Sequence, residues 1–304
     1  MGTSPMPDRS VPLALDLPPE NVFGHTHKLS LCLEACARMR VRRAGNSLQI
    51  LDVGCGSGYA VTRFLGGAGD EALGIDLHEP NIRYARRAFA RPGLRFECRD
   101  AESLIGERQT YDIVVLADIL EHLTDPGAVL RNCRRLLRND GLLLVTVPNG
   151  FGSFEFESAL SRMPLLGTLL LKATEYAVAV LNKFGPLKGK WSAAAGAAPA
   201  DLPYNLESAH LQFFTSRRLV ALLRGAAFDV TRTENLCFLA GPFTNFLLGA
   251  SPGFCRWNVA VARRLPRLAA SAWYFECAPG AGPPAPVSAR PSEHEAVATP
   301  DRRR

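Results

Sequence analysis

The stretch Ile50-Leu-Asp-Val-Gly-Cys-Gly-Ser-Gly58 decides the fold of this 304-residue chain. A short apolar run over 48–53 carries the Asp52 carboxylate and then breaks into three glycines at alternate positions. A helical pattern over 59–65 follows directly. Strand, glycine turn and helix N-terminus in this order bring backbone N–H groups close to a bound ligand, with no side chains in between. The sequence therefore predicts a ligand-binding turn at the end of a strand.

Strands and helices continue to alternate after this turn. Apolar runs predict strands at 72–77, 111–117 and 142–147, and an alternating pattern predicts one at 94–98. Helical patterns fall at 80–90 and from Pro126 to a stop at Asn139-Asp-Gly141. Five strands joined by helical crossovers within about 100 residues predict a doubly wound, mostly parallel α/β sheet. Two closing strands, at 228–233 and 271–277, complete a seven-stranded sheet.

The flanking segments divide the chain into parts. Residues 1–20 are predicted to be a flexible leader and 278–304, rich in Pro and Ala, a disordered tail. The domain between them, 21–277, begins with a helix over 25–43. An insertion at 151–209 follows the fifth strand, and we expect it to cover the acceptor crevice at the carboxyl ends of the strands.

Composition limits the classes of function. A net charge of +6 allows anionic partners, but no aromatic and basic module indicates nucleic-acid binding. The eight cysteines are dispersed without a Cys-x-x-Cys pair, which predicts reduced thiols in a cytoplasmic protein. No secretory signal is present. The apolar stretch 165–181 is broken by Lys172 and Glu175, so core helix faces or peripheral contact with a membrane surface both account for it.

Two ligand classes compete for the glycine turn. A dinucleotide fingerprint requires Gly-x-Gly-x-x-Gly, whereas here Tyr59 occupies the position of the third glycine. Asp52 also lies two positions before the first glycine, where a carboxylate would repel a pyrophosphate and attract an ammonium group. The turn therefore favours an amino-acid-bearing ligand.

The motif Asp52-x-Gly54-x-Gly56-x-Gly58 resembles motif I of class I S-adenosylmethionine-dependent methyltransferases. The segment Leu116-Ala-Asp-Ile-Leu-Glu-His-Leu-Thr-Asp-Pro126 is similar to the fourth-strand motif of their broad small-molecule branch, which includes the ubiquinone-pathway enzymes. The stretch 210–228 resembles the segment before strand six of that branch. The resemblance covers 48–148 and 210–233, and it implies a Rossmann-like fold and S-adenosyl-L-methionine as cofactor.

The resemblance also implies which residues bind the cofactor. Asp52 would act through the amino group or order the turn, the glycines would allow close backbone approach, and Asp118 would lie near the methionine portion. Asp76 would accept the ribose hydroxyls, and Asp100 with Ala101 would face the adenine. The implied cofactor-binding residues are Asp52, Gly54, Gly56, Gly58, Asp76, Leu77, Asp100, Ala101 and Asp118.

Two histidines are candidate catalytic residues. His122 follows Asp118 by one turn and could act as a general base, or bond to backbone as a structural residue. His210 could reach the same mouth from the other side, or hold the insertion in place. Asp118-x-x-Glu121-His122 resembles a divalent-metal group of ubiquinone-pathway and small-RNA methyltransferases. Asp replaces Glu at its first position, however, and relatives without metal share the Glu-His pair, so no metal ligand is assigned.

The sequence thus predicts methyl transfer from S-adenosylmethionine to an oxygen of a small or lipid-linked acceptor, such as a sugar, a phenol or an envelope glycolipid. A non-catalytic cofactor-binding or scaffold protein is the alternative, and a nicotinamide oxidoreductase is the third hypothesis. The oligomeric state and the acceptor cannot be predicted from these residues.

Overall fold

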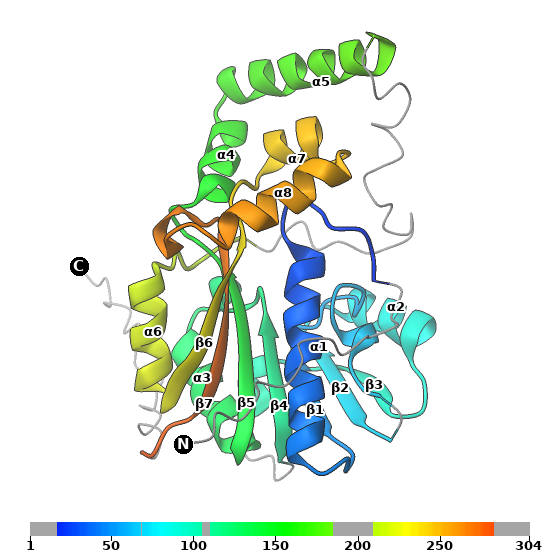
Figure 1. The fold of residues 1–304 in the computed structure, drawn as a ribbon, viewed down its shortest axis with the longest axis vertical. Helices are drawn as coiled ribbons and strands as arrows, with labels where there is room; N and C mark the ends of the chain where they lie inside the picture. The colour runs from blue at the N-terminus through cyan, green and yellow to red at the C-terminus, as the bar shows by residue number, and fades with distance from the viewer. Residues whose placement is uncertain (1–16, 68, 105–109, 185–208, 283–304) are drawn as a thin grey trace, which may run out of the picture.

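A computed structural model describes residues 17–67, 69–104, 110–184 and 209–282 (Figure 1). Seven strands form one sheet in the order β3-β2-β1-β4-β5-β7-β6, with β7 antiparallel to both neighbours. The strands are β1 (Gln49–Val53), β2 (Glu71–Asp76), β3 (Leu94–Cys98), β4 (Tyr111–Ala117), β5 (Leu137–Pro148), β6 (Phe228–Cys237) and β7 (Ala272–Pro279). The predicted doubly wound, mostly parallel seven-stranded fold is confirmed.

Helices cover both faces of the sheet, as a doubly wound fold requires. Alternate residues of β1 point to opposite faces, so Ile50 belongs to one hydrophobic cluster and Leu51 to the other. The Ile50 face is covered by α1 (His25–Arg42) and α2 (Glu79–Phe89). The Leu51 face is covered by α3 (Pro126–Leu136) and α6 (Ser216–Gly225). This packing fixes the carboxyl ends of β1, β2 and β4 side by side.

The glycine turn does not lead into an α-helix, so the helix predicted over 59–65 is wrong. Only a three-residue 3₁₀ helix, η1 (Thr62–Phe64), follows the turn. Gly56 and Gly58 both adopt left-handed backbone conformations, which a right-handed helix cannot include at its start, and Gly66 adopts another. The crossover from β1 to β2 therefore lacks the helix that the alternating pattern predicted.

The helix end predicted at Asn139-Asp-Gly141 is also wrong. The structure ends α3 at Leu136 and places these residues inside β5. Their register against β4 shifts between Tyr111 and Ile113, which is a β-bulge. A bulge accommodates the exposed Asn and Asp while the strand continues, because the extra residues leave the ladder only locally.

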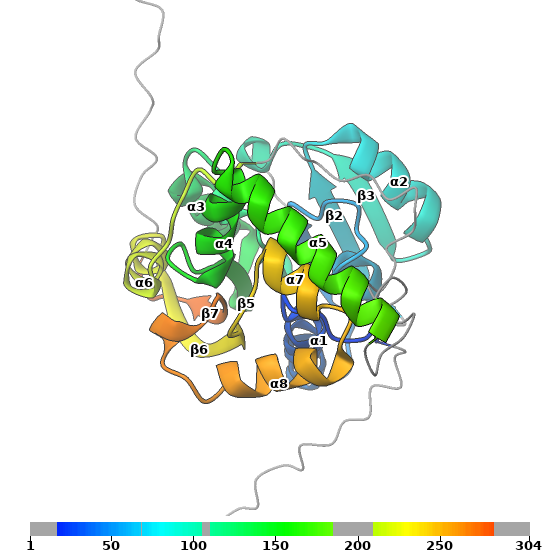
Figure 2. The ribbon, with the colours of Figure 1, turned by 90° about the horizontal axis from the view of Figure 1, so that it is seen from above.

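Four helices lie beyond the carboxyl edge of the sheet (Figures 1 and 2). They are α4 (Ser153–Arg162), α5 (Leu166–Phe184), α7 (Pro242–Leu248) and α8 (Pro252–Ala262). In the view from above, α5 crosses over α4 and α7 (Figure 2). No single helix among the described residues has the length and apolarity to cross a membrane; α4 and α5 meet both criteria only together, across a 108° bend.

Several predictions concern the ends of the chain and the insertion. Most of the predicted leader and tail, and the Ala/Gly loop within 151–209, lie outside the described residues. From the leader the structure describes Leu17 onward, where the Glu20 carboxylate accepts hydrogen bonds from the Thr26 and His27 N–H groups of α1. From the predicted tail it describes 278–282, of which 278 and 279 are the last residues of β7.

Candidate active site

Backbone hydrogen bonds attach the glycine turn to the end of β2. The N–H groups of Gly54 and Cys55 both donate to the Ile75 carbonyl at the end of β2, at 2.8 and 2.9 Å. Gly54 has a φ of 73°, and a Cβ placed there would come within 2.1 Å of the Ile119 side chain. Gly56 has a φ of 55°, but a Cβ there would meet nothing closer than 4.0 Å. Gly54 thus serves close packing, whereas Gly56 leaves an open approach to the backbone.

Asp52 lies beneath this turn and is 1% exposed. Its Oδ2 accepts a hydrogen bond from the Thr62 hydroxyl at 2.6 Å, whereas its buried Oδ1 has no hydrogen-bond partner. Burial raises the pKa of the Asp52 carboxyl to about 7; the Thr62 hydrogen bond opposes this shift, and nearby Asp76 adds to it. Asp52 therefore joins the turn to η1 and keeps one oxygen without a partner.

Asp76 ends β2 beside the same turn. One carboxylate oxygen accepts from Gly56 N–H and the other from His78 N–H, each at 2.8 Å. This places the carboxylate against Gly56, as expected for a residue facing a ligand at the turn. Leu77, which follows it, is 71% exposed. An exposed leucine beside a polar turn is available to contact the flat face of a ligand.

Asp100 and Ala101 occupy the next strand end. The Arg99 N–H donates to the Asp76 carbonyl at 2.8 Å, which ties this segment to the end of β2. Asp100 accepts from the Glu102 N–H at the start of η2 (Ala101–Leu104), and Ala101 is buried. The predicted cofactor residues therefore follow one another along the carboxyl edge, in the order expected from their strands.

Asp118 forms an ion pair that the sequence did not indicate. Its carboxylate contacts the Lys28 ammonium of α1 and also accepts from the Thr146 hydroxyl at 2.7 Å. The Lys28 side chain is 4% exposed, whereas that of Asp118 is 36% exposed. Burial raises the pKa of Asp118, but the Lys28 ammonium outweighs burial and holds this pKa below its usual range. Asp118 also adopts a left-handed φ of 55°, which turns the chain out of β4.

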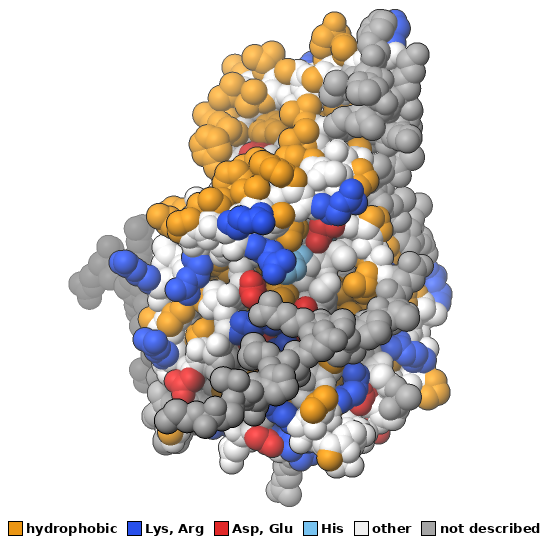
Figure 3. All heavy atoms as spheres, viewed as in Figure 1, with side chains coloured by type: hydrophobic (Ala, Val, Ile, Leu, Met, Phe, Trp, Pro, Cys, Tyr) orange, Lys and Arg blue, Asp and Glu red, His pale blue; other side chains and the backbone are white. Residues whose placement is uncertain are grey.

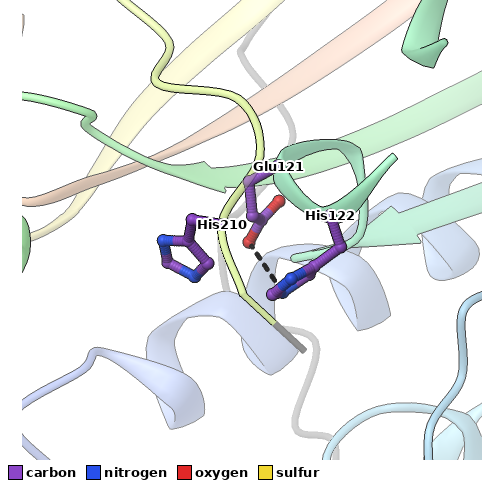
Figure 4. Close-up of side chains that lie close together, drawn as sticks. All are labelled: Glu121, His122 and His210. Carbon is purple, nitrogen blue, oxygen red and sulfur yellow. Dashed lines mark ion pairs between the residues drawn. The ribbon is translucent and has the colours of Figure 1, made fainter. Parts of the chain in front are cut away.

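The two candidate histidines meet beside a buried carboxyl (Figure 4). The rings of His122 and His210 lie 4.9 Å apart between centroids. His122 Nδ1 lies 3.1 Å from the Ala209 carbonyl oxygen, which can only accept, so this nitrogen carries a proton. Burial lowers the pKa of His122 below its usual value, so the ring favours the neutral form with its lone pair on Nε2.

His210 pairs with a carboxylate from the insertion. Its Nδ1 lies 2.5 Å from Glu155 Oε1, at the start of α4. The backbone carbonyl of Glu121 accepts hydrogen bonds from the Leu211 and Gln212 N–H groups. These bonds hold the segment that follows His210 against η3 (Leu120–His122). A carboxylate on one ring nitrogen orients a histidine and favours a basic Nε2.

Aromatic rings lead away from this pair toward α1. Measured between ring centroids, Phe154 lies 5.6 Å from His210 and 6.3 Å from Phe23. The Phe23 ring stacks on His25 with a centroid distance of 5.5 Å. Burial, followed by the Lys28 charge, lowers the pKa of His25 to about 3, so this ring is neutral. An aromatic row beside two histidines suits a planar or ring-shaped acceptor.

Comparison with known proteins agrees with this geometry. Residues 51–145 match the family described as "Methyltransferase domain". A ubiquinone biosynthesis O-methyltransferase of Caulobacter sp. strain K31 is 32% identical over 144 residues, which are 43% of this chain and 57% of that protein. A Neisseria meningitidis serogroup C protein of the same name is 28% identical over 211 residues, which are 68% of this chain and 78% of that protein. Together, these matches support a class I S-adenosylmethionine-dependent methyltransferase.

Solved structures are similar at lower identity. An S-adenosylmethionine-dependent methyltransferase from Clostridium acetobutylicum has a TM-score of 0.49 and 10% identity, and the match covers 84% of this chain and 92% of that one. A further curated relative, the ubiquinone biosynthesis O-methyltransferase of Parvibaculum lavamentivorans, is 32% identical over 112 residues. The chain spans about half the length of this relative and of the Caulobacter relative, 44% and 57%.

This assignment confirms the predicted family and its cofactor, S-adenosylmethionine. The role of each residue in the methyltransferase stays a prediction. The structure does bring most of the predicted cofactor residues together, since Asp76 bonds Gly56 and Gly54 packs on Ile119 next to Asp118. It also adds two residues that sequence reasoning missed, Lys28 and Glu155. Lys28 lies four residues before Cys32, on the apolar face of α1, and a charged residue at such a position was the available signal.

The structure also groups residues that have the chemistry to bind a divalent cation. Ligand atoms of Glu121, His122 and His210 lie within 4.8 Å of one another. Glu121 is 1% exposed and its Oε2 has no hydrogen-bond partner, which is costly unless a ligand binds it. Both histidines have their Nδ1 next to an oxygen, the arrangement that orients metal-binding histidines. The chemistry of these donors therefore fits a divalent cation, although the sequence alone assigned no metal ligand.

Proposed function

We propose that this protein transfers a methyl group from S-adenosylmethionine to a hydroxyl oxygen of a small or lipid-linked acceptor. The observation that carries the proposal is the pair formed by Glu155 and His210 beside His122, at the edge where the cofactor residues lie. A hydroxyl oxygen is a weak nucleophile until it loses its proton, so a base at this place has a purpose. The names of the curated relatives support an oxygen acceptor, and a phenol is the acceptor we favour.

The cofactor supplies the electrophilic methyl group when bound. The chain's own residues align the acceptor and accept its proton. His210 Nε2 takes the hydroxyl proton as the oxygen attacks, while the Glu155 carboxylate stabilises the positive charge that forms on the ring. Asp118 presents a carboxylate that attracts the ammonium of an amino acid, and the buried Lys28 ammonium holds this carboxylate in place. Much of the rate then comes from holding the reacting atoms in line.

A divalent cation held by Glu121, His122 and His210 is a second way to activate the same oxygen. Such an ion would lower the pKa of the acceptor hydroxyl that it binds. Dialysis against excess chelator separates the two possibilities. Activity lost on chelation and restored by magnesium or manganese supports the metal, whereas full activity in excess chelator excludes it.

The proposal is tested by measuring S-adenosylhomocysteine formation with catechol-type phenols and with sugars as acceptors. We expect turnover with an oxygen acceptor, and we expect Glu155→Gln to reduce kcat roughly 10²-fold while the affinity for S-adenosylmethionine is unchanged. Glu71→Gln, which changes an exposed residue at the start of β2, is the matched control. Glu155 acts through His210, so the variant should also shift the pH at which kcat rises.

Two results would contradict this assignment. Donor binding without turnover on any acceptor would favour the scaffold alternative. A wild-type kcat in Glu155→Gln would show that the Glu155 carboxylate does not assist His210, and the assignment of His210 as the base would be wrong.

A further inference from the structure

The surface formed by α4, α5 and α7 exposes large hydrophobic side chains, and we name it the apical surface. Figure 3 shows hydrophobic side chains covering this end of the molecule. Among them Phe156 is 65% exposed, Leu165 88%, Leu169 65% and Tyr176 74%. Isolated exposed leucines are ordinary, but a contiguous group of this kind marks an interaction site.

The exposed residues of α5 fall on one side of the helix. Leu165, just before the helix, is followed at intervals of four, seven and four residues by Leu169, Tyr176 and Val180. These intervals repeat the helical period, so the four side chains form one stripe. Lys172 lies three residues after Leu169, on the same side. A stripe of leucine, tyrosine and lysine is typical of helices that lie in a membrane interface, where lysine extends its ammonium to the headgroups.

The orientation of α5 agrees with such a contact. After the 108° bend from α4, α5 lies across the end of the molecule (Figures 1 and 2). A helix in this position presents its whole length to a flat surface. It thereby meets the geometry of an interfacial helix, which lies in the plane of the bilayer.

Positive charge flanks the apical surface. Arg256 of α8, and Arg263, Arg264 and Arg267 after it, are all exposed. The sequence from Phe238 to Ser271 contains no Asp or Glu. Lys and Arg side chains gather below the hydrophobic end in Figure 3, near α8. Arginine beside an apolar surface complements anionic lipid headgroups, which attract each basic residue near the membrane surface.

We propose that the apical surface docks on an anionic lipid bilayer. The stripe of α5 enters the boundary between headgroups and acyl chains, and the arginines around α8 contact the anionic headgroups. Because α4 also carries Glu155, docking places the candidate active site next to the membrane, where a lipid-linked acceptor resides. This contact goes beyond the proposed methyl transfer and does not depend on it, since lipid binding needs neither donor nor acceptor.

Sedimentation of the full chain with lipid vesicles tests the proposal. We expect binding to phosphatidylcholine vesicles containing about 30% phosphatidylglycerol, and weaker binding to pure phosphatidylcholine. The double variant Leu165→Asp, Leu169→Asp should weaken binding to the anionic vesicles at least about tenfold, because two charges oppose insertion of the stripe. Both side chains are exposed, so the fold should tolerate the change.

Val41→Asp is the matched control, because Val41 is 81% exposed near the end of α1 that points away from the apical surface (Figure 1). It should bind vesicles as the wild type does. Arg263→Glu, Arg264→Glu should remove the preference for phosphatidylglycerol. Wild-type binding by the Leu165→Asp, Leu169→Asp variant, or no binding by the wild type, would overturn the proposal. A lipid-free dimer that this double variant converts to a monomer would also overturn it, by assigning the surface to a second copy of the chain.

Discussion

Asp52 has a structural role at the turn, and we predict a binding role for the same side chain. In the ligand-free protein its carboxyl has one hydrogen-bond partner and is buried, so the protonated form is favoured. An ammonium group at the turn would reverse this preference by compensating the carboxylate. The same burial that destabilises the ligand-free carboxylate thus strengthens its attraction to a cationic ligand, because the surrounding dielectric constant is low.

Asp52→Asn should therefore change how stability depends on pH. The pKa of Asp52 is raised in the folded state to about 7, so the wild type loses stability as pH rises from about 4 to 7. Asparagine cannot ionise, and relative to the wild type this variant should gain about 1–3 kcal/mol in the free energy of unfolding between about pH 4 and pH 8. Urea unfolding without donor, followed by circular dichroism, measures the difference. Donor affinity at the higher pH should fall.

Asp70→Asn is the control of opposite sign. Burial opposes ionisation of Asp70, but hydrogen bonds from Arg40 and from the Leu48 and Gly67 N–H groups outweigh burial and lower its pKa. Its contribution to stability is present above the unfolded pKa and is lost as pH falls through the folded value. The variant should therefore be destabilised more as pH rises. Equal pH dependence in both variants would contradict the account of Asp52.

At the scale of the element, the three glycines of the turn have different structural roles. Gly54 is tightly enclosed, since an added Cβ would approach the Cδ1, Cγ1 and Cβ atoms of Ile119 within 3 Å. An added Cβ at Gly58 would come within 2.7 Å of the Phe96 ring. Gly56 faces open space and donates to Asp76. Two of the glycines therefore pack the turn against the fold, and Gly56 adjoins the space where a ligand is expected.

Alanine substitutions should separate these two functions. Gly54→Ala should cost about 3 kcal/mol in the free energy of unfolding, from the left-handed backbone together with the clash. Gly56→Ala should cost only about 1 kcal/mol, because strain remains without a clash. Its donor affinity, measured by calorimetry, should nevertheless fall at least about tenfold, since the methyl group enters the ligand's space. Wild-type affinity in Gly56→Ala would show that the ligand lies elsewhere.

The elements also show what the sequence could predict and why. Most of the parallel strands were predicted because they are apolar runs, and β3 because its residues alternate. The family motifs then assigned Asp52, Asp76, Asp100 and Asp118 at or near the ends of these strands, without any knowledge of packing. The helix after the turn was mispredicted because apolar spacing alone does not register the backbone conformations of Gly56 and Gly58. Lys28 and Asp118 are 90 positions apart, and Glu155 and His210 are 55 apart. Only the fold brings such pairs together.

At the scale of the whole molecule, the candidate site is assembled from distant parts of the chain. Lys28 comes from the first helix, the turn from β1, Asp118 from the end of β4, and Glu155 from the insertion. The sheet positions the predicted cofactor residues, whereas α4 beyond it supplies Glu155, the partner of the candidate base His210. A ligand at the shared edge would contact several of these elements at once, so its binding should be coupled to the stability of the whole fold.

S-adenosylhomocysteine should therefore stabilise the protein against heat. At a concentration about 100-fold above Kd, a ligand that binds only the folded state adds about 2.7 kcal/mol to the free energy of unfolding. For a domain of this size the midpoint should rise by roughly 5–10 °C. Differential scanning fluorimetry measures the shift, with NAD at the same concentration as the control. Asp76→Ala should abolish most of the shift, because the carboxylate at Gly56 is lost. A shift with NAD that equals the one with S-adenosylhomocysteine would contradict the distinction drawn from Tyr59 and Asp52, since the turn would then accept a dinucleotide equally well.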